Sequence, residues 1–473
     1  MKIIKILIPL LSVFFLLSST ISGNAQTDDQ SAYYLIQPGD TLGSISNKFD
    51  ISEEDLIFAN NILDPNFISP GDRLLIPNLV GISGLITPVV LNIGETLDSI
   101  TRFYGVDAQK LISLNKITAL TNIIAGSTIL VPIKENTLIE TNTINYYSTQ
   151  FTLLESSVKL DTTIEKIEST NHIASILPLI GNQRLSIDNL NLDSQPENPA
   201  IENIHISLSP LPLIQGTTMS LRVSSPMPIT ISGSINGSNL NFYTENNMDI
   251  FALQGIQALS EPGVSVFELS IQTEEGTLVN YEQSILIQSG FFTTDPPLFV
   301  DPETIDPQNT ASEEILINEL VANFTEEKYW SGIFNSPAYY QEYTSLFGNR
   351  RTYNDDPKIS FHSGLDFGGG VTLPIVAPAD GKVVFSRFLP IRGNAIFIDH
   401  GLGVYTGYFH QSLLEVAEGE FVTAGQKIGE VGNTGRVSNG TDYPGAGAHL
   451  HWEVWVNGVQ VNPLDWLNQK YPE

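Results

Sequence analysis

Short apolar runs in the N-terminal part of the chain alternate with apolar residues at helical spacing. YYLIQ predicts a strand that stops at Pro38-Gly39, and LLIP predicts a second strand after Pro70-Gly71. Between these strands, Thr41 is a candidate N-cap for a helix whose apolar positions are Leu42, Ile45 and Phe49. Ser52 with Asp55 predicts the start of a second helix. The pattern therefore reads strand, helix, helix, strand.

This pattern repeats after 55 residues without a gap. Eight identities keep the register: Gly39, Thr41, Leu42, Ile45, Leu56, Asn60, Gly71 and Pro77 recur as Gly94, Thr96, Leu97, Ile100, Leu111, Asn115, Gly126 and Pro132. Residues 33–77 and 84–133 are thus predicted to be two copies of one module. A degenerate third copy is predicted at about 145–188, where the turn-forming Pro-Gly pairs are missing.

From about 198 to 290 the pattern changes to short β-rich runs such as SLRVSS, ITISGSI and VFELSI, separated by Gly, Pro and Asn. This alternation predicts a small antiparallel sandwich, and it contains no titratable cluster, so a spacer or docking role is expected. Residues 291–311 are rich in proline and acid and predict a semi-extended tether. Thr310 with Glu313 then predicts a capping box, which completes a 291–327 segment of tether and helix.

The apolar stripe predicted for that helix is Ile315, Leu316, Leu320 and Phe324. We expect it to pack on the C-terminal domain, residues 328–473; the alternative is that it covers a cleft there. In that domain, VAPADGKVVFS and VTAGQKIGEVGNTG place turn glycines between alternating apolar residues, which predicts hairpins in a mostly antiparallel sheet.

Composition and charge narrow the classes of function. The net charge is -30, of which the C-terminal 146 residues (10 basic, 14 acidic) carry -4. A nucleic-acid partner is not expected, because phosphate binding needs a basic face. The N-terminus has Lys2 and Lys5, an apolar run from Ile6 to Leu17 and a small-x-small site ending at Ala25, which predicts a signal peptide over 1–25 and an exported protein. A retained membrane anchor is the alternative, although the run is short for a span.

Five of the seven histidines fall between positions 362 and 451. His362 and Asp366 are spaced H-x-x-x-D, and His449 and His451 are spaced H-x-H in HLHWEVWV, whose composition predicts a strand that would direct both imidazoles to one face. Two imidazoles and one carboxylate suit a catalytic Zn²⁺, which keeps a fourth position free. His410, with whichever of the H-x-H pair is not on the metal, can handle the proton of a bound water.

Six blocks of the C-terminal part, in order, resemble the lysostaphin-like zinc endopeptidases of the M23 family, which cleave peptide cross-links of peptidoglycan: LFGNRR, FHSGLDFGG, VAPADGKVVFS, GNAIFIDHGLGVYTGYFHQS, VTAGQKIGEVGNTGR and HLHWEV. The resemblance implies that His362, Asp366 and His451 bind zinc. It also implies that His410 and His449 form the catalytic pair. His400 needs no ligand role and is interpreted as structural. One departure is RVSNGTDYPGAGA before HLH, an insertion expected to shape the rim of the cleft.

The two repeated modules resemble LysM, which binds N-acetylglucosamine units of peptidoglycan or chitin. In that family the sugar groove lies between the loop after the first strand and the loop before the last. Most side chains there are expected to cap and turn the chain, with sugar contacts made largely by backbone groups. The resemblance implies the following glycan-binding positions: Gly39, Asp40, Thr41, Asn60 and Ile68 in the first copy, and Gly94, Glu95, Thr96, Asn115 and Ile123 in the second.

The sequence therefore predicts a multidomain chain of small α+β LysM modules (βααβ), an all-β sandwich-like domain and a mostly antiparallel β M23 peptidase domain. The predicted function is that of an exported, wall-associated, Zn²⁺-dependent endopeptidase held on peptidoglycan by LysM, with membrane contact only through the signal peptide. The alternatives are a non-hydrolytic regulator that activates another wall hydrolase, and an adhesion or scaffold protein. They differ in whether the chain binds zinc and whether the C-terminal domain cuts muropeptides.

Overall fold

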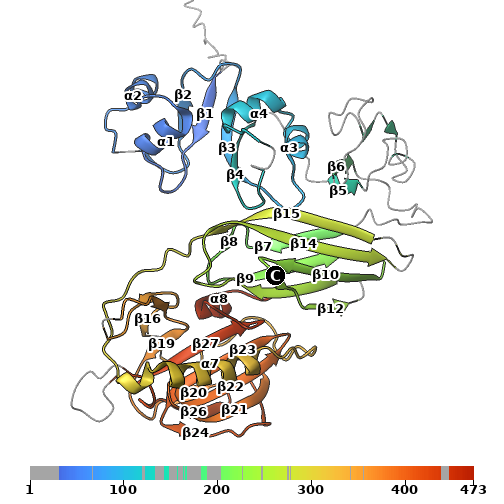
Figure 1. The fold of residues 1–473 in the computed structure, drawn as a ribbon. Coiled ribbons are helices and arrows are strands. Elements are labelled where there is room, and N and C mark those ends of the chain that lie inside the picture. The colour runs from blue at the N-terminus through green and yellow to red at the C-terminus, as the bar shows by residue number, and fades with distance from the viewer. Residues whose placement is uncertain are drawn as a thin grey trace, which may run out of the picture. The chain divides into compact units, whose positions relative to one another are not determined.

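The computed structural model describes residues 31–66, 68–119, 123–133, 143–148, 157, 163–164, 166–167, 183–188, 204–225, 227–246, 249–273, 276, 278–340, 342–354, 356–437 and 447–472 (Figure 1). The predicted signal peptide, most of the predicted third module and most of the insertion before HLH lie outside these residues. The chain divides into two compact units, Met1–Ile86 and Thr87–Glu473. None of the helices in the described ranges combines the length and the apolar character that a membrane span requires.

The first unit has the predicted order: β1 (Ala32–Leu35), α1 (Leu42–Phe49), α2 (Glu53–Asn60) and β2 (Arg73–Ile76). Both predicted N-caps are confirmed, because Thr41 accepts a hydrogen bond from the Ser44 amide and Ser52 accepts one from the Asp55 amide. β1 pairs antiparallel with β2 and in parallel with residues 84–86. Burial of one large apolar side chain contributes about 1.5–3 kcal/mol, so the few buried here give a small core.

The second module opens the second unit. It contains β3 (Gly84–Val90, which begins in the first unit), α3 (Leu97–Phe103), α4 (Ala108–Leu114) and β4 (Thr128–Ile133). Thr96 and Ser99 form a reciprocal capping box, and Asp107 caps α4. Further along, β5 (Thr143–Ser148) pairs antiparallel with β6 (Gln183–Asp188). These strands lie at the two ends of the predicted third module, about 145–188, which stays a prediction.

The β-rich region forms two sheets, as predicted for a sandwich. One has the order β11-β10-β14-β15-β8 and the other β12-β13-β9-β7. Inward side chains of β9 and β14, such as Leu221 and Phe267, share one core. The strands are β7 (His205–Ser209), β8 (Leu213–Ile214), β9 (Thr218–Ser224), β10 (Ile229–Ile235), β11 (Ser238–Asn239), β12 (Phe242–Asn246), β13 (Asp249–Gly255), β14 (Gly263–Thr273) and β15 (Leu278–Gln288).

The segment predicted to be a tether is extended but docked. Thr294 and Leu298 form parallel bridges with Arg350 and Tyr353, and the Asp295 carboxylate accepts a hydrogen bond from the Arg351 side chain at 2.9 Å. A short 3-10 helix, η3 (Pro302–Thr304), follows. The segment is therefore extended, as predicted, but it is docked rather than a simple tether, since its backbone and an acidic group have partners on the C-terminal domain.

The helix that follows, α7 (Pro307–Val321), also differs from its prediction. It begins at Pro307 with Asp306 as N-cap, so the predicted capping box at Thr310 and Glu313 is wrong. Thr310 lies inside the helix and its hydroxyl donates to the Asp306 carbonyl.

The predicted stripe on α7 is correct only in part. Ile315 and Leu316 are exposed, whereas Ile317 and Val321 are buried against the sheet of the C-terminal domain. Leu320 and Phe324 pack as predicted. Packing, rather than covering a cleft, is thus what the buried face of α7 does.

The C-terminal domain is built on one large antiparallel sheet with the order β16-β19-β27-β23-β22-β21-β25, to which β28 adds beside β27. Two smaller sheets, β20-β26-β24 and β17-β18, complete it. The elements are β16 (Tyr343–Ser345), β17 (Arg350–Arg351), β18 (Ser360–Phe361), β19 (Leu365–Gly368), β20 (Pro374–Val376), β21 (Gly381–Leu389), β22 (Gly393–Gly401), β23 (Val404–Gln411), β24 (Leu413–Leu414), β25 (Phe421–Val422), β26 (Lys427–Glu430), β27 (His449–Val456), β28 (Val459–Val461) and α8 (Pro463–Asn468).

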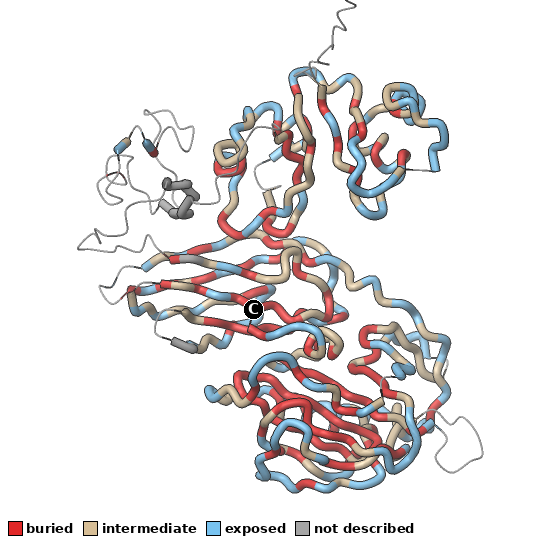
Figure 2. Tube along the Cα trace, turned by 180° about the vertical axis from the view of Figure 1, so that it is seen from behind, coloured by how far each residue is buried: buried red, intermediate tan, exposed pale blue. Residues whose placement is uncertain are grey.

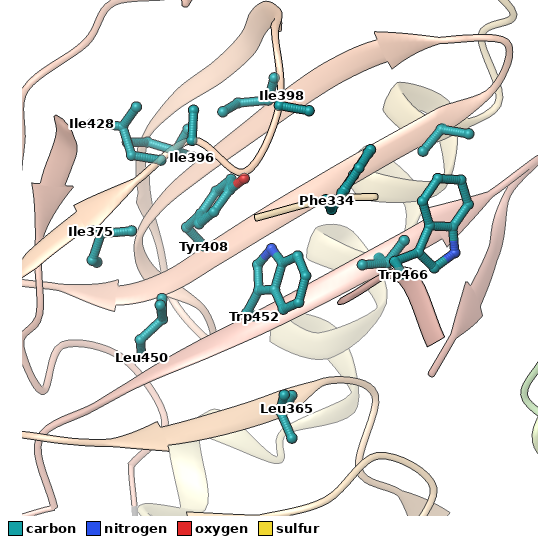
Figure 3. Packing of buried hydrophobic residues seen from close by; sticks show 14 of the residues in the cluster. Phe334, Leu365, Ile375, Ile396, Ile398, Tyr408, Ile428, Leu450, Trp452 and Trp466 are labelled. Carbon is teal, nitrogen blue, oxygen red and sulfur yellow. The ribbon is translucent and has the colours of Figure 1, made fainter. Parts of the chain in front are cut away.

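Both faces of this sheet are covered. Leu450, Trp452 and Trp466 belong to the larger core on one face, where Tyr408 and Ile396 also pack (Figure 3). On the other face, Phe409 and Trp455 pack against α7. Buried residues are accordingly concentrated along the central strands of this domain (Figure 2). Strands buried on both sides form a rigid platform, and the clustered histidines lie on it.

Candidate metal centre

Three neighbouring strands bring the clustered histidines and Asp366 together. β27 lies between β19 and β23, and His451 is in register with Asp366 on one side and with Phe409 on the other. Because side chains alternate along a strand, Leu450 and Trp452 enter the large core while His451 projects from the opposite face. The predicted strand for HLHWEVWV is confirmed.

His362, Asp366 and His451 meet at one point. The Nε2 of His362 lies 2.9 Å from Oδ1 of Asp366 and 3.0 Å from Nδ1 of His451, and the last two atoms are 2.7 Å apart. All three side chains are buried. Ligands about 2.1 Å from a tetrahedral zinc lie about 3.4 Å from one another, so a small outward shift would admit the ion.

The hydrogen-bond partners of the two imidazoles fix which nitrogen faces this point. Nδ1 of His362 lies 2.8 Å from the Leu346 carbonyl oxygen, and Nε2 of His451 lies 3.3 Å from Oε1 of Glu453. Both partners only accept, so we assign the protons to these outer nitrogens. The inner nitrogens then present lone pairs beside the Asp366 carboxylate. Three acceptors at contact distance need a cation between them, and the nitrogen and oxygen donors suit Zn²⁺.

The electrostatics favour the ionised form of the Asp366 carboxylate. Burial alone would raise the pKa of Asp366, but His362 and His451 hold it well below its usual range. Burial lowers the pKa of His362, against the opposing effect of Asp366. For His451 burial also lowers the pKa, but hydrogen bonds to Asp366 and Glu453 outweigh it and the net shift is upward.

Glu453 was not identified from the sequence. Its buried carboxylate accepts hydrogen bonds from Ser363 Oγ at 2.5 Å, Trp455 Nε1 at 2.7 Å and Gln460 Nε2 at 3.0 Å, besides facing His451. Although burial raises its pKa, these partners and the charges nearby lower it to about 2. The signal was present in the spacing, because Glu453 follows His451 by two residues and a strand directs both to one face.

His410 and His449 flank the three-residue cluster. Their ring centroids lie 4.9 Å apart, and Nε2 of His449 is 3.8 Å from Oδ1 of Asp366. Each Nδ1 lies 2.7 Å from a backbone carbonyl oxygen, that of Thr434 for His410 and that of Gly447 for His449. We therefore assign the protons to Nδ1, which leaves each Nε2 free to accept one.

His410 occupies an unusual backbone position. Its φ of 61° lies in the left-handed region, which a non-glycine residue adopts at a cost. The His410 amide donates to the Arg392 carbonyl, which helps to hold this conformation. Burial, reinforced by His449 and His451, keeps the pKa of His410 well below its usual value. A neutral imidazole at pH 7 can accept a proton from water.

His400 is separate from this cluster. It is fully buried, with Nδ1 2.7 Å from the Asp380 carbonyl oxygen and Nε2 2.8 Å from Oγ1 of Thr406. Burial lowers its pKa to about 4. These contacts hold strands β21, β22 and β23 together, in line with the structural role expected from the sequence.

Two supporting contacts come from the docked segment. Arg351, which contacts Asp295, places NH2 3.7 Å from Oδ2 of Asp366. Glu313 of α7 is buried and accepts hydrogen bonds from NH1 of Arg392 at 2.7 Å and from the Ile391 amide at 2.8 Å. No sequence spacing links these pairs, so only the fold reveals them.

The glycan-binding positions implied by the LysM resemblance fall into two groups. Asn60 and Asn115 each bond to three backbone groups within their own modules, and Thr41 and Thr96 are N-caps. Asp40 accepts from Tyr34 and Lys48, and Glu95 accepts from the Asn92 amide. Gly39, Gly94, Ile68 and Ile123 lie in the groove loops, and Gly39 is exposed whereas Gly94 is buried.

The comparisons with known families define the class of the two repeated modules and of the C-terminal domain. Residues 360–463 match the model of peptidase family M23, and residues 34–77 and 90–132 match that of the LysM domain. The chain thus carries an M23 peptidase domain and two LysM domains, as the sequence analysis predicted.

Particular proteins resemble the chain over part of its length. It is 38% identical over 121 residues to the peptidoglycan DD-endopeptidase ShyA of Vibrio cholerae, covering 26% of each. It is 37% identical over 110 residues to the murein hydrolase activator NlpD of Salmonella dublin, covering 23% of this chain and 27% of NlpD. Each match therefore spans about a quarter of the relative. A crystal structure of an M23 peptidase from Pseudomonas aeruginosa has 24% identity and a TM-score of 0.38, covering 52% of this chain and 96% of that one.

Proposed function

We propose that this protein is an exported, zinc-dependent endopeptidase that hydrolyses peptide bonds in the stems or cross-links of peptidoglycan. The observation that carries the proposal is the convergence of His362 Nε2, Asp366 Oδ1 and His451 Nδ1 within 3.0 Å of one another, with their lone pairs directed inward. A zinc ion held there would lower the pKa of water toward 7 and polarise a scissile carbonyl.

His410 and His449 carry out the proton transfers of the proposed reaction. Nε2 of His449 or of His410 accepts the proton of the attacking water, since both carry a lone pair in the proposed tautomer. The same imidazoles, once protonated, donate to the oxyanion or to the leaving amine. The Thr434 and Gly447 carbonyls keep each ring oriented while its Nε2 exchanges protons.

Glycan binding and export complete the proposal. LysM holds the enzyme on the glycan strands, which matters because an insoluble substrate is scarce in solution and a linked module supplies a local concentration of about millimolar. The apolar N-terminal run supports export to the wall. The name of ShyA supports a D,D cross-link as the first bond to test.

A second candidate function is favoured by one observation, the similarity to the activator NlpD. A non-hydrolytic activator needs no metal, whereas the three metal-binding side chains proposed here are all present and oriented. This difference favours the enzyme.

The test is digestion of purified peptidoglycan sacculi by the zinc-loaded full chain, with new amino termini counted and fragments identified by mass. The enzyme releases amino termini, and His451→Ala abolishes the release while the surface variant Glu418→Gln keeps it. Full activity of His451→Ala would refute the assignment. Hydrolysis that appears only when a second wall hydrolase is added would favour the activator.

A further inference from the structure

The groove loops of the second LysM domain are residues 92–96 and 123–127. They contact the two-sheet sandwich formed by strands β7 to β15, here called the β domain. The Gly94 amide donates to Oε1 of Gln283 at 2.8 Å. The Ala125 amide donates to the Ser284 carbonyl at 3.0 Å, and the Leu286 amide donates to the Ala125 carbonyl at 2.8 Å. Ala125 thus forms a parallel bridge along strand β15.

Apolar packing accompanies these hydrogen bonds. Ile93 and Ala125 are 4% and 1% exposed, and both belong to the core of the β domain rather than to that of their own module. The backbone at Gly126 approaches just as closely, because a Cβ atom there would lie 2.8 Å from Cα of Pro212. Protein therefore covers the part of the groove side formed by Ile93, Gly94, Ala125 and Gly126.

The corresponding loops of the first LysM domain differ in burial at each of these positions, and in residue type at two of them. Subtracting 55 from Ile93, Gly94 and Ala125 gives Pro38, Gly39 and Pro70, which are all exposed. Pro70 has no amide hydrogen, so it is unable to donate as Ala125 does. An apolar Ile93 in place of Pro38 suits burial. At these two positions, 93 and 125, the second copy has residues that suit docking, whereas the first copy has proline.

The contact also protects an open strand edge. β15 pairs with β14 along one side, but on its other side β8 covers only Ile287 and Gln288. Exposed strand edges invite pairing with other chains, and proteins commonly cover them. Ala125 covers the edge immediately before β8, at residues 284–286.

We infer that the two LysM domains have separate roles: the second uses its groove loops to dock on β15, and the first carries the glycan-binding groove. This inference rests on the proposed glycan-holding function of LysM. Sugar recognition in so shallow a groove relies on backbone groups, and the Gly94 and Ala125 groups are already bonded within the protein. The ligand of the first groove is a run of N-acetylglucosamine units.

The test is amide hydrogen exchange of the full chain with and without the N-acetylglucosamine hexamer. Without sugar, the amides of Ala125 and Leu286 exchange slowly, because both are hydrogen-bonded across the contact. Added hexamer protects residues 36–42 and 68–72 and leaves 92–96 and 123–127 unchanged. Protection of the second pair of loops by the hexamer, or of neither pair, would overturn the inference.

Two variants of the full chain sharpen this test. Gly39→Val, at a φ of 87° where the added side chain enters open space, lowers hexamer affinity by about tenfold or more. Gln283→Ala speeds exchange at Gly94 and leaves hexamer affinity within about twofold. Equal loss of affinity in both variants would contradict the inference. If a variant unfolds its module, the exchange pattern of the wild type still tests the inference. Digestion of sacculi tests the proposed function separately.

Discussion

Oε1 of Glu453 lies 3.3 Å from Nε2 of His451, on the side of the imidazole away from Asp366. A carboxylate in this position fixes the tautomer and the orientation of the ring, and so directs Nδ1 toward the proposed metal. Three further hydrogen bonds, including one from Ser363, hold the carboxylate itself. The strand that supplies the imidazole thus also supplies the group that orients it.

Substituting Glu453 by Gln should weaken zinc binding by about 10- to 100-fold, because a neutral amide no longer holds the His451 tautomer. Competition with a chromophoric chelator measures the affinity. Glu418→Gln, an exposed carboxylate that pairs with Arg387, is the control and should leave the affinity unchanged. An affinity for Glu453→Gln equal to that of the control would show that the carboxylate does not orient the ligand.

Replacing His410 or His449 by Ala should separate catalysis from metal binding. Each variant should still bind one zinc, since neither imidazole belongs to the three-residue cluster. Release of amino termini should fall by about 10²- to 10⁴-fold, the usual contribution of a proton-transfer group. Zinc content and turnover are measured on the same sample. Loss of the metal from His449→Ala would show that His449 is itself a zinc ligand.

Glu313→Ala should destabilise the peptidase domain by about 3–5 kcal/mol, because it leaves Arg392 without its buried partner. Urea unfolding followed by tryptophan fluorescence reports on this domain, since all four tryptophans lie in it. Glu314→Ala, the exposed neighbour on the same helix, should change the free energy of unfolding little. Similar losses in both variants would mean that the ion pair contributes nothing specific.

The buried His400 should make the domain acid-sensitive. Burial lowers its folded pKa to about 4, whereas the unfolded value is about 6.5, so between these pH values the unfolded state binds more protons. Stability is therefore complete above about pH 6.5 and is lost as the pH falls toward 4, by about 3 kcal/mol in total. Unfolding of metal-free wild type and His400→Gln across this range measures the difference. Parallel pH profiles for the two proteins would refute the prediction.

Local signals in the sequence predicted much of this fold. The N-caps Thr41 and Ser52 and the alternation in HLHWEVWV each depend on residues within a few positions of one another, and the signals of the first module recur 55 residues later in the second. What these patterns specify is confirmed, because capping and alternation are local chemistry. The strands at VAPADGKVVFS and VTAGQKIGEVGNTG are present, but they do not form the predicted hairpins, because β20 pairs with β26 and β21 with β25. The pairing of β27 with β19 and β23 likewise joins strands that are far apart in the sequence.

The predictions that were wrong concern residues whose contacts are with residues far away in the sequence. Thr310 with Glu313 looks like a capping box, but Asp306 followed by Pro307 starts the helix earlier and Glu313 turns inward to Arg392. The acidic, proline-rich segment predicts a semi-extended tether, and the sequence gives no sign of the hydrogen bond from Arg351 to Asp295 that docks it. Likewise, Gly94 and Gly39 are equivalent in the repeat, and only the contact with Gln283 distinguishes them.

The zinc content of the purified chain and of three single variants tests the central claim most directly. The wild type should hold one zinc per chain after exhaustive dialysis, and His362→Ala, Asp366→Ala and His451→Ala should each hold none while keeping the folded fluorescence spectrum. Retention of a full equivalent of zinc by any one of these variants would contradict the shared site.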